Sequence, residues 1–476
     1  MLFRSYVWDV GLHYVGGAQN SASLLRRTLD YLTDGTLAWQ PLPEVYDRAF
    51  VGERRYDFVA GTERFRARMH DYFPRDGRAI DRYIKAVCAA ARAVNAYSAE
   101  KVLPPALSAV AGGALRLPFL HWARRTTAEI LDALTDNREL KGVLAAQWGD
   151  YGLPPGRSSF GIHAVIVHSY LEGAAYPVGG AASLATAMAP VLAQSGGRIV
   201  VDAPVAAVAV EQGKAVGVRM EDGREFRAPV VLSDAGFLTT LNELVPPDAA
   251  GAEKLRRAGT DFEPSASHVC LYVGMRDVTP EASNLWLFPS YDHDENAARF
   301  ERDPEAPFPF LYVSFPSAKD PEFARSHPGR ATAEVMALMP YRLFSGWEKT
   351  RWKKRPADYE AFKRRLTDRL QEALLRRLPE VAGRIEIAEL STPITTRHFT
   401  RHQMGAIYGI AATPLRFANR SLKPRTPISG LFLTGQDAAL PGITGALVGG
   451  ILAASAVLKR NLMAVVTTAK PPTGSH

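Results

Sequence analysis

The stretch "GLFLTGQDAALPGITGALVGGILAASAVL", residues Gly430–Leu458, decides how the rest of the sequence is interpreted. It predicts a short buried strand over Leu431–Thr434, then Gly435 and a lone acid, Asp437, and then a glycine-rich apolar helix after Pro441. In this order, the acid can accept hydrogen bonds from the hydroxyls of a ligand. The free N–H groups at the helix start can donate hydrogen bonds to electron-rich oxygens of the same ligand. Taken alone, Asp437 is more often a helix N-cap.

The composition is that of a globular protein with a large core, because 47% of the 476 residues are hydrophobic and 22% are charged. This length predicts two or three structural units. The two cysteines, Cys88 and Cys270, lack CxxC spacing, which argues against a disulfide framework and fits a reducing compartment. No secretory signal is visible, and the apolar run Gly442–Leu458 is shorter than the roughly 20 residues of a membrane span. We therefore expect a cytoplasmic protein.

Two contrasting patterns predict an α/β fold. Leu37–Leu171 is rich in Ala, Arg and aromatic residues at helical spacing. Further on, a helix opens at Gly179–Gly180, a strand follows over Arg198–Asp202, and three short strands come next, with "EQGK" and "EDGR" as hairpin turns. The last strand, Ala228–Leu232, ends in the small residues Ser233–Gly236. These residues either let a ligand approach the backbone at the carboxyl edge of a sheet or form an ordinary turn.

Much of the net charge of +8 comes from residues 349–377. Within this stretch Tyr359, Leu366, Leu370 and Leu374 fall at helical spacing, which predicts an amphipathic basic helix. The commoner explanation is a solvated helix face. The functional alternative is docking on an anionic membrane surface, at the inner face of the membrane. We expect no nucleic-acid partner, because no binding motif accompanies the charge.

A second pattern, HxxxH, joins His398 and His402. The residues around them look strand-like and are mostly Thr and Arg, and no carboxylate is suitably spaced to complete a metal site. We therefore interpret both histidines as structural and predict no metal site.

Four segments resemble, in this order, the FAD-dependent phytoene desaturase and carotenoid isomerase superfamily, and its retinol saturase-like branch in particular. The resemblance covers nearly the whole chain. The piece "DVGLHYVGG" discriminates this branch, and the order of the four segments makes the resemblance specific. They are "YVWDVGLHYVGG" (6–17), "YPVGGAASL" (176–184), "TPITTRHFTRHQMGAIYG" (392–409) and "GLFLTGQDAALPGITGALVGGILAA" (430–454).

The resemblance implies a two-domain fold with FAD as cofactor. One domain would be a discontinuous Rossmann-like FAD-binding domain that includes the β-meander, and the other a mixed sheet and helical substrate-binding domain. The implied FAD-binding segments are 1–30, 172–240 and 403–462, the substrate-binding segments are 31–171 and 241–402, and 463–476 would be a disordered tail.

The resemblance also implies a set of site residues. Asp437 would accept hydrogen bonds from the ribityl hydroxyls, the helix start at 443–445 would face the flavin pyrimidine oxygen, and the backbone of Val205 would read adenine. His13 and Tyr14, with Tyr408, are candidates for the flavin-facing catalytic wall, although with respect to catalysis we favour the interpretation of His13 as a hydrogen-bonded core histidine. The residues implied to bind FAD are Gly11, Val205, Ser233, Asp234, Ala235, Gly435, Asp437, Ile443, Thr444 and Gly445.

The sequence departs from the family at one place. Family members begin with a strand, GxGxxG and a helix, which bind the ADP half of FAD, and no GxGxxG occurs here. We hypothesise that the true start lies upstream or that the N-terminus is truncated. If the chain is native as written, its affinity for FAD should be much weakened.

The implied activity is that of an FAD-dependent oxidoreductase acting on carbon–carbon double bonds of a hydrophobic polyene, such as a retinoid or carotenoid, by hydride transfer at flavin N5. A redox-neutral cis–trans isomerase is the alternative enzyme. A non-catalytic chain that binds apolar ligands or a membrane is the alternative from another class. No second dinucleotide fingerprint identifies an electron partner.

Overall fold

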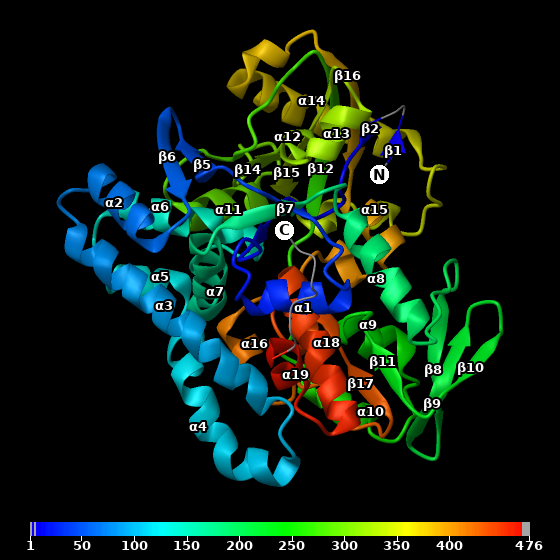
Figure 1. Ribbon diagram of the computed structural model, residues 1–476. Coiled ribbons are helices and arrows are strands. Elements are labelled where there is room, and N and C mark those ends of the chain that lie inside the picture. Colours follow the sequence, from blue (N-terminus) through cyan, green and yellow to red (C-terminus); the bar gives the residue numbers. More distant parts are fainter. Residues whose placement is uncertain (1, 4–5, 469–476) are drawn as a thin grey trace.

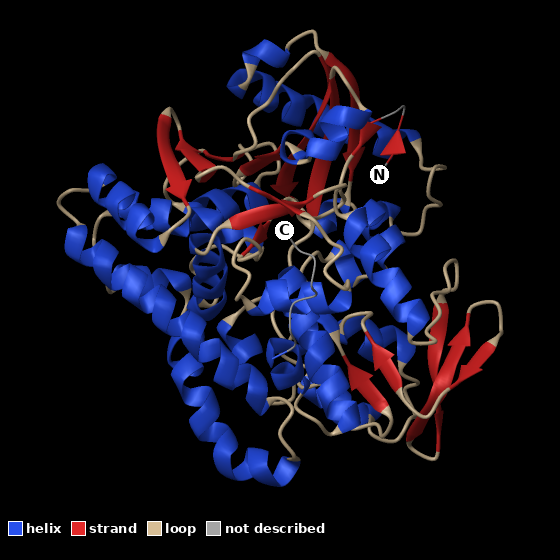
Figure 2. Cartoon of the chain, viewed as in Figure 1, coloured by secondary structure: helices blue, strands red, loops and turns tan. Residues whose placement is uncertain are grey.

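The computed structural model describes residues 2–3 and 6–468 (Figure 1). It is a mixed α/β structure in which one group of strands lies in the upper part of the view, a second group lies at the lower right, and helices fill the lower left (Figure 2). The predicted tail 463–476 starts inside helix α19 (Leu462–Thr468), so residues 463–468 are helical rather than disordered, since Val466 is buried. Residues 469–476 lie outside the described part.

The largest sheet has seven strands in the order β16–β12–β15–β14–β13–β5–β6. Neighbours are antiparallel except β13 and β5, which are parallel. In β12, alternate residues face opposite sides: Val269, Leu271 and Val273 belong to one core cluster, whereas Cys270 and Tyr272 belong to another. The strands are β5 (Val45–Val51), β6 (Arg54–Val59), β12 (His268–Arg276), β13 (Asn284–Phe288), β14 (Leu311–Ser314), β15 (Arg330–Leu338) and β16 (Ile385–Ser391).

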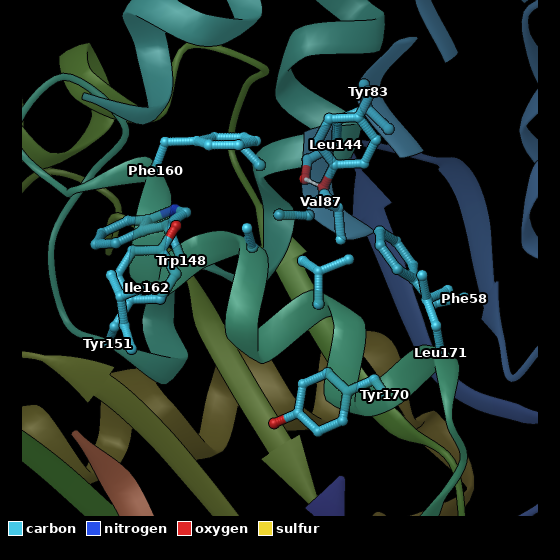
Figure 3. Packing of buried hydrophobic residues seen from close by; sticks show 14 of the residues in the cluster. Phe58, Tyr83, Val87, Leu144, Trp148, Tyr151, Phe160, Ile162, Tyr170 and Leu171 are labelled. Carbon is cyan, nitrogen blue, oxygen red and sulfur yellow. Dashed lines mark hydrogen bonds between the residues drawn. The ribbon is translucent and has the colours of Figure 1, made fainter. Parts of the chain in front are cut away.

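Helices cover this sheet and build a second core. Helix α14 (Ala357–Arg377) is the predicted amphipathic helix, and its buried Leu366, Leu370 and Leu374 pack on the cluster that holds Val269. A helical layer of α3 (Gly77–Glu100), α4 (Pro105–Ala123) and α7 (Phe160–Leu171) extends to the lower left (Figure 1). Its aromatic core includes Tyr83, Trp148, Tyr151 and Phe160 (Figure 3).

The prediction of helices throughout Leu37–Leu171 is wrong at its start. Residues 39–59 form β4 (Trp39–Pro41), β5 and β6. In β5, Tyr46, Ala49 and Phe50 are buried because the strand lies between β13 and β6. These long-range pairs stabilise the strands, and no local pattern in the sequence reports them.

Two segments far apart in the sequence form a parallel pair. Strand β11 (Val231–Ser233) pairs with β17 (Leu431–Leu433), so that Ser233 lies beside Leu433. A separate antiparallel sheet of β8 (Val205–Glu211), β9 (Lys214–Met220) and β10 (Glu225–Arg227) confirms the predicted meander (Figure 1). The domain boundaries themselves stay a prediction.

The predicted strand over Arg198–Asp202 is wrong. Helix α8 (Ala182–Gln194) ends as predicted, but none of the described strands pairs with the residues that follow it. Ile199, Val200 and Val201 are 64%, 57% and 76% exposed. A run of valines forms a strand only beside a partner strand, and this segment has none among the residues described.

Close packing explains the glycines of the last long helix. Helix α18 (Gly442–Leu458) lies against the short helix α17 (Gly435–Ala438). A Cβ at Gly449 would overlap the backbone carbonyl of Gly435, and a Cβ at Gly445 would overlap that of Leu440. By contrast, a Cβ at Gly450 would meet no atom within 4 Å. The glycines at 445 and 449 therefore let the helix approach the backbone.

We expect Gly449→Ala to lower the free energy of unfolding by about 2–3 kcal/mol, because the added methyl group meets backbone that cannot move aside. Gly450→Ala is the matched control on the same helix, and we expect it to be neutral or to stabilise by up to about 1 kcal/mol through helix propensity. Urea denaturation of both variants measures the difference. Equal effects would show that the contact with Gly435 is not tight.

A buried histidine makes the fold sensitive to acid. His163 is fully buried, and its ring nitrogens lie 2.8 Å and 3.1 Å from the hydroxyls of Tyr83 and Tyr151. Burial lowers its pKa to about 3. Because the unfolded chain takes up this proton at its ordinary pKa of 6.5, stability should fall as the pH drops from about 6.5 towards 3.

We expect His163→Gln to flatten this dependence by about 1 kcal/mol per pH unit between pH 6 and 4. The amide keeps one donor and one acceptor for the two tyrosines but does not titrate. Denaturant midpoints collected across this range give the two slopes. Identical slopes for the variant and the parent chain would contradict the prediction.

Candidate functional site

A cavity of about 980 Å³ lies beside the large sheet, where β12, β14, β15 and β16 meet α14 and α15 (Pro393–Thr400). Its inner wall is aromatic. Trp286 of β13 packs on Tyr312 of β14 with ring centroids 4.5 Å apart, and on Phe310 at 5.4 Å. Tyr408 adds a fourth ring, and its hydroxyl donates to the carbonyl of Gly149 at 3.2 Å. Such a wall suits a long apolar ligand.

Within the described part of the chain, the acidic residues that line this cavity are Asp150, Glu360 and Glu389. Asp150 lines it and accepts a hydrogen bond at Oδ2 from the hydroxyl of Tyr170 at 2.9 Å. Burial, followed by the charge of Asp47, raises the pKa of Asp150 well above its usual range. The site therefore favours the neutral, proton-bearing form of Asp150. No local signal points to this residue, because nothing in "QWGDYG" distinguishes Asp150 from other acidic residues.

His13 lines the cavity and also belongs to a buried ionic cluster. Its Nδ1 lies 2.8 Å from Oε2 of Glu334, which is fully buried on β15. Lys319 donates to the carbonyl of His13 at 3.0 Å and to Oγ of Ser314 at 2.7 Å. Burial lowers the pKa of Lys319 to about 7 and raises that of Glu334. Both interpretations of His13, as a core histidine and as part of the cavity wall, therefore fit.

Tyr14 is not among the residues that line the cavity. Its hydroxyl donates to Oδ2 of Asp47 at 2.8 Å, and Gln147 and Trp286 donate to the same oxygen at 3.0 Å each. Asn284 donates to Oδ1 at 2.9 Å. Asp47 is fully buried, and burial raises its pKa. This carboxyl group holds Tyr14 behind the cavity and fixes the indole of Trp286 in the wall.

Asp437 ties three segments together. It is buried, and its Oδ2 accepts from the backbone N–H of Phe237 at 2.7 Å while Oδ1 accepts from that of Ile410 at 2.9 Å. The guanidinium of Arg416 lies 3.7 Å away. Asp437 is not the N-cap of α18, which is Pro441. Its contact with a ribityl chain stays a prediction.

The parallel pair brings several of the predicted FAD-binding residues together. Ser233 ends β11, Asp234 and Ala235 follow it, and Gly435 comes after β17, so they meet at one edge. A Cβ at Gly435 would overlap the carboxylate of Asp234, so glycine is required there. Partial desolvation, followed by the charge of the nearby Asp437, raises the pKa of Asp234, although this residue is exposed to solvent.

The start of α18 lies near the N-terminal segment. Ile443 packs in the same cluster as Leu12, next to Gly11, which lines the cavity. Thr444 and Gly445 complete the first turn of α18, in which the N–H of Gly442 donates to Oε1 of Gln436 at 3.3 Å. Val205, in contrast, lies in the separate meander sheet, paired with Met220.

The two histidines of the HxxxH pattern do not lie in a strand, contrary to the prediction. His398 is in α15 and stacks on Trp352 with ring centroids 5.2 Å apart, and Nδ1 of His402 lies 3.0 Å from the carbonyl oxygen of Ala406. Helix α15 begins with a proline at its first position, which favours a helix start over a strand.

No protein-family model matches the chain. Individual relatives do. The chain is 32% identical over 482 residues to all-trans-retinol 13,14-reductase of Danio rerio, covering 96% of this chain and 79% of the relative. It is 31% identical to the Homo sapiens protein of that name over 478 residues, with 96% and 78% covered. It is 28% identical to chloroplastic prolycopene isomerase of Arabidopsis thaliana over 286 residues, covering 58% of this chain and 44% of the relative.

Solved structures share the fold. A putrescine oxidase variant superposes with a TM-score of 0.59 at 13% identity, covering 96% of this chain and 89% of that one. An oxidoreductase from Methanosarcina mazei gives 0.55 at 13% identity, with 94% and 87% covered. Together with the relatives, these likenesses confirm the resemblance seen in the sequence. The chain belongs to the family of the all-trans-retinol 13,14-reductases, within the FAD-dependent phytoene desaturase and carotenoid isomerase superfamily.

Proposed function

We propose that the chain is an FAD-dependent oxidoreductase that acts on carbon–carbon double bonds of a hydrophobic polyene. The observation that carries the proposal is the aromatic cavity of about 980 Å³, which is also lined by Gly11 and His13, two residues predicted to lie against the flavin. Trp286, Phe310 and Tyr312 form a wall along which an extended apolar chain can align.

The residues near α18 fit a flavin. A Cβ at Gly11 or Gly442 would meet no atom within 4 Å, and both glycines have positive φ, so their backbone is open to a ligand. The first turn of α18 would direct its N–H groups and the positive end of its dipole at the ring. When bound, FAD supplies hydride transfer at N5.

Saturation of a double bond also needs a proton at the neighbouring carbon. Asp150 holds a proton at the cavity wall, with Tyr170 bonded to its Oδ2. Buried Lys319 holds the backbone of His13 in place by donating to its carbonyl oxygen at 3.0 Å. In this proposal Asp150 supplies the proton, and the aromatic wall excludes water from the reacting carbons.

Redox-neutral isomerisation is the second candidate, favoured by the likeness to prolycopene isomerase. In addition, we propose that residues 349–377 meet an anionic membrane surface. Trp352 and Phe399 are 36% and 64% exposed at the cavity rim, next to Lys353, an arrangement that suits a lipid surface. None of the helices within residues 6–468 combines the length and apolar character that crossing a membrane requires.

The first test is a visible absorption spectrum of the chain purified after expression with FAD. Flavin bands in near-stoichiometric amount support the proposal, and a folded but colourless chain contradicts it. Mass analysis of a polyene incubated with the reduced protein then separates the two activities, because saturation adds two hydrogens and isomerisation adds none. Activity needs this direct measurement, since a Danio rerio relative, 28% identical, is named as an inactive all-trans-retinol 13,14-reductase.

A further inference from the structure

A cationic side chain stands apart from the other charged groups at the outer part of the cavity. Arg355 lines the cavity and stacks on the ring of buried Tyr359, 4.7 Å from its centroid. Its Nε and Nη1 are both buried, and neither has a hydrogen-bond partner among the residues described. Buried donors without acceptors are rare in folded proteins, because each one forfeits its hydrogen bonds to water.

The neighbouring charges are already paired or exposed. Lys363, which also lines the cavity, donates to Oε1 of Glu389 at 2.5 Å. Arg397 forms an ion pair with Glu348, and neither of these residues lines the cavity. Glu360 lines the cavity but is exposed to solvent. Within residues 6–468, no carboxylate lies within ion-pair distance of Arg355.

The groups around Arg355 favour an anion. The hydroxyl of Tyr359 lies 3.0 Å from that of Thr392, which lies 3.2 Å from the hydroxyl of Thr395. Thr395 and Thr396 line the cavity in the first turn of α15, where the helix dipole is positive. A guanidinium, threonine hydroxyls and a helix start together form the kind of surface that binds a carboxylate.

We propose that the cavity takes an amphipathic polyene whose outer end carries an anionic oxygen group such as a carboxylate, which Arg355 binds. The apolar chain lies along Trp286, Phe310 and Tyr312, and the anion supplies the acceptors that Nε and Nη1 lack. A pure hydrocarbon would leave these donors unpaired, and an alcohol would give a neutral and weaker acceptor. This inference rests on the proposed function and names its substrate class.

The test compares two polyenes that differ at one end, all-trans-retinoate and all-trans-retinol. Both absorb near the emission of tryptophan, so quenching of Trp286 and Trp352 reports binding without turnover. We expect the full chain to bind the carboxylate at least tenfold more tightly than the alcohol at pH 7.5 and moderate salt.

Arg355→Met should abolish this preference, with little change in the affinity for the alcohol. The matched control is Arg364→Met, which removes the same charge from an exposed position of α14 that does not line the cavity. Arg355→Gln is a second variant that keeps polarity without charge, and it should behave like Arg355→Met.

Every other outcome contradicts either this inference or the proposed function. If the parent chain binds both polyenes equally, the inference is wrong and the proposed function stands. If Arg364→Met lowers the preference as much as Arg355→Met does, the attraction comes from overall charge and the inference is again wrong. If neither polyene binds to the folded chain, the proposed function itself fails.

Discussion

Replacing Asp437 by alanine is expected to lower the free energy of unfolding by about 3–5 kcal/mol, one of the two largest effects we foresee. The substitution removes the acceptor of two buried backbone N–H groups, those of Phe237 and Ile410. It also leaves the fully buried guanidinium of Arg416 without its carboxylate. Removing one partner of a buried ion pair typically costs 3–5 kcal/mol, because the other charge stays desolvated.

Urea denaturation followed by circular dichroism measures this loss, and the neighbouring acid provides the control. Asp234 lies at the same edge but is exposed to solvent, and partial desolvation and the nearby Asp437 raise its pKa. We therefore expect Asp234→Asn to change stability by no more than about 0.5 kcal/mol, with a small gain from the relieved repulsion. An Asp437→Ala variant within 1 kcal/mol of the parent chain would show that the three segments hold together without it.

Asp47→Ala is the second large effect, with an expected loss of at least about 4 kcal/mol. Four side chains donate to this one fully buried carboxyl group, and each donor left without an acceptor costs about 1–3 kcal/mol. The loss should extend to ligand binding, because Trp286 uses its Nε1 bond to Asp47 to hold its ring in the cavity wall.

Tyr14→Phe is the matched control for Asp47→Ala. It removes one of the four donors and keeps the packing of the ring against Tyr170, so we expect a loss of about 1 kcal/mol. Thermal unfolding measures the stability of both variants. Quenching of tryptophan fluorescence by a bound polyene reports whether Trp286 keeps its position in the cavity wall. If Asp47→Ala costs no more than Tyr14→Phe, the four hydrogen bonds do not act together.

The features predicted correctly from the sequence are those with a local signal. The 3.6-residue spacing of Leu366, Leu370 and Leu374 predicted α14, and the glycine-containing hairpins predicted the meander. The strands β5 and β6, and the absence of a strand at Ile199–Val201, escaped prediction, because a strand depends on a partner that the local sequence does not name.

In the candidate site, too, residues with a local sequence signal could be predicted and the others could not. Asp437 could be singled out because it sits between a strand and a glycine-rich helix. Asp150, Glu334 and Lys319 could not, since no motif marks them in the sequence and only tertiary packing buries them. Arg355 was one cation among many in a basic stretch, and what sets it apart is the missing partner in the fold.

The pairing of β11 with β17 has a consequence for how the chain is made. The backbone N–H of Phe237 donates to Asp437, which is synthesised 200 residues later. At a synthesis rate of about 5–20 residues per second, the ribosome needs roughly 10–40 seconds to deliver the partner. During that interval the nascent β11 edge is open to chaperones and to other chains. Loss of the residues after Gly430 would remove β17, Asp437 and α18 together, so a late stop codon would delete the predicted flavin-binding helix start while leaving every cavity-lining residue in the polypeptide.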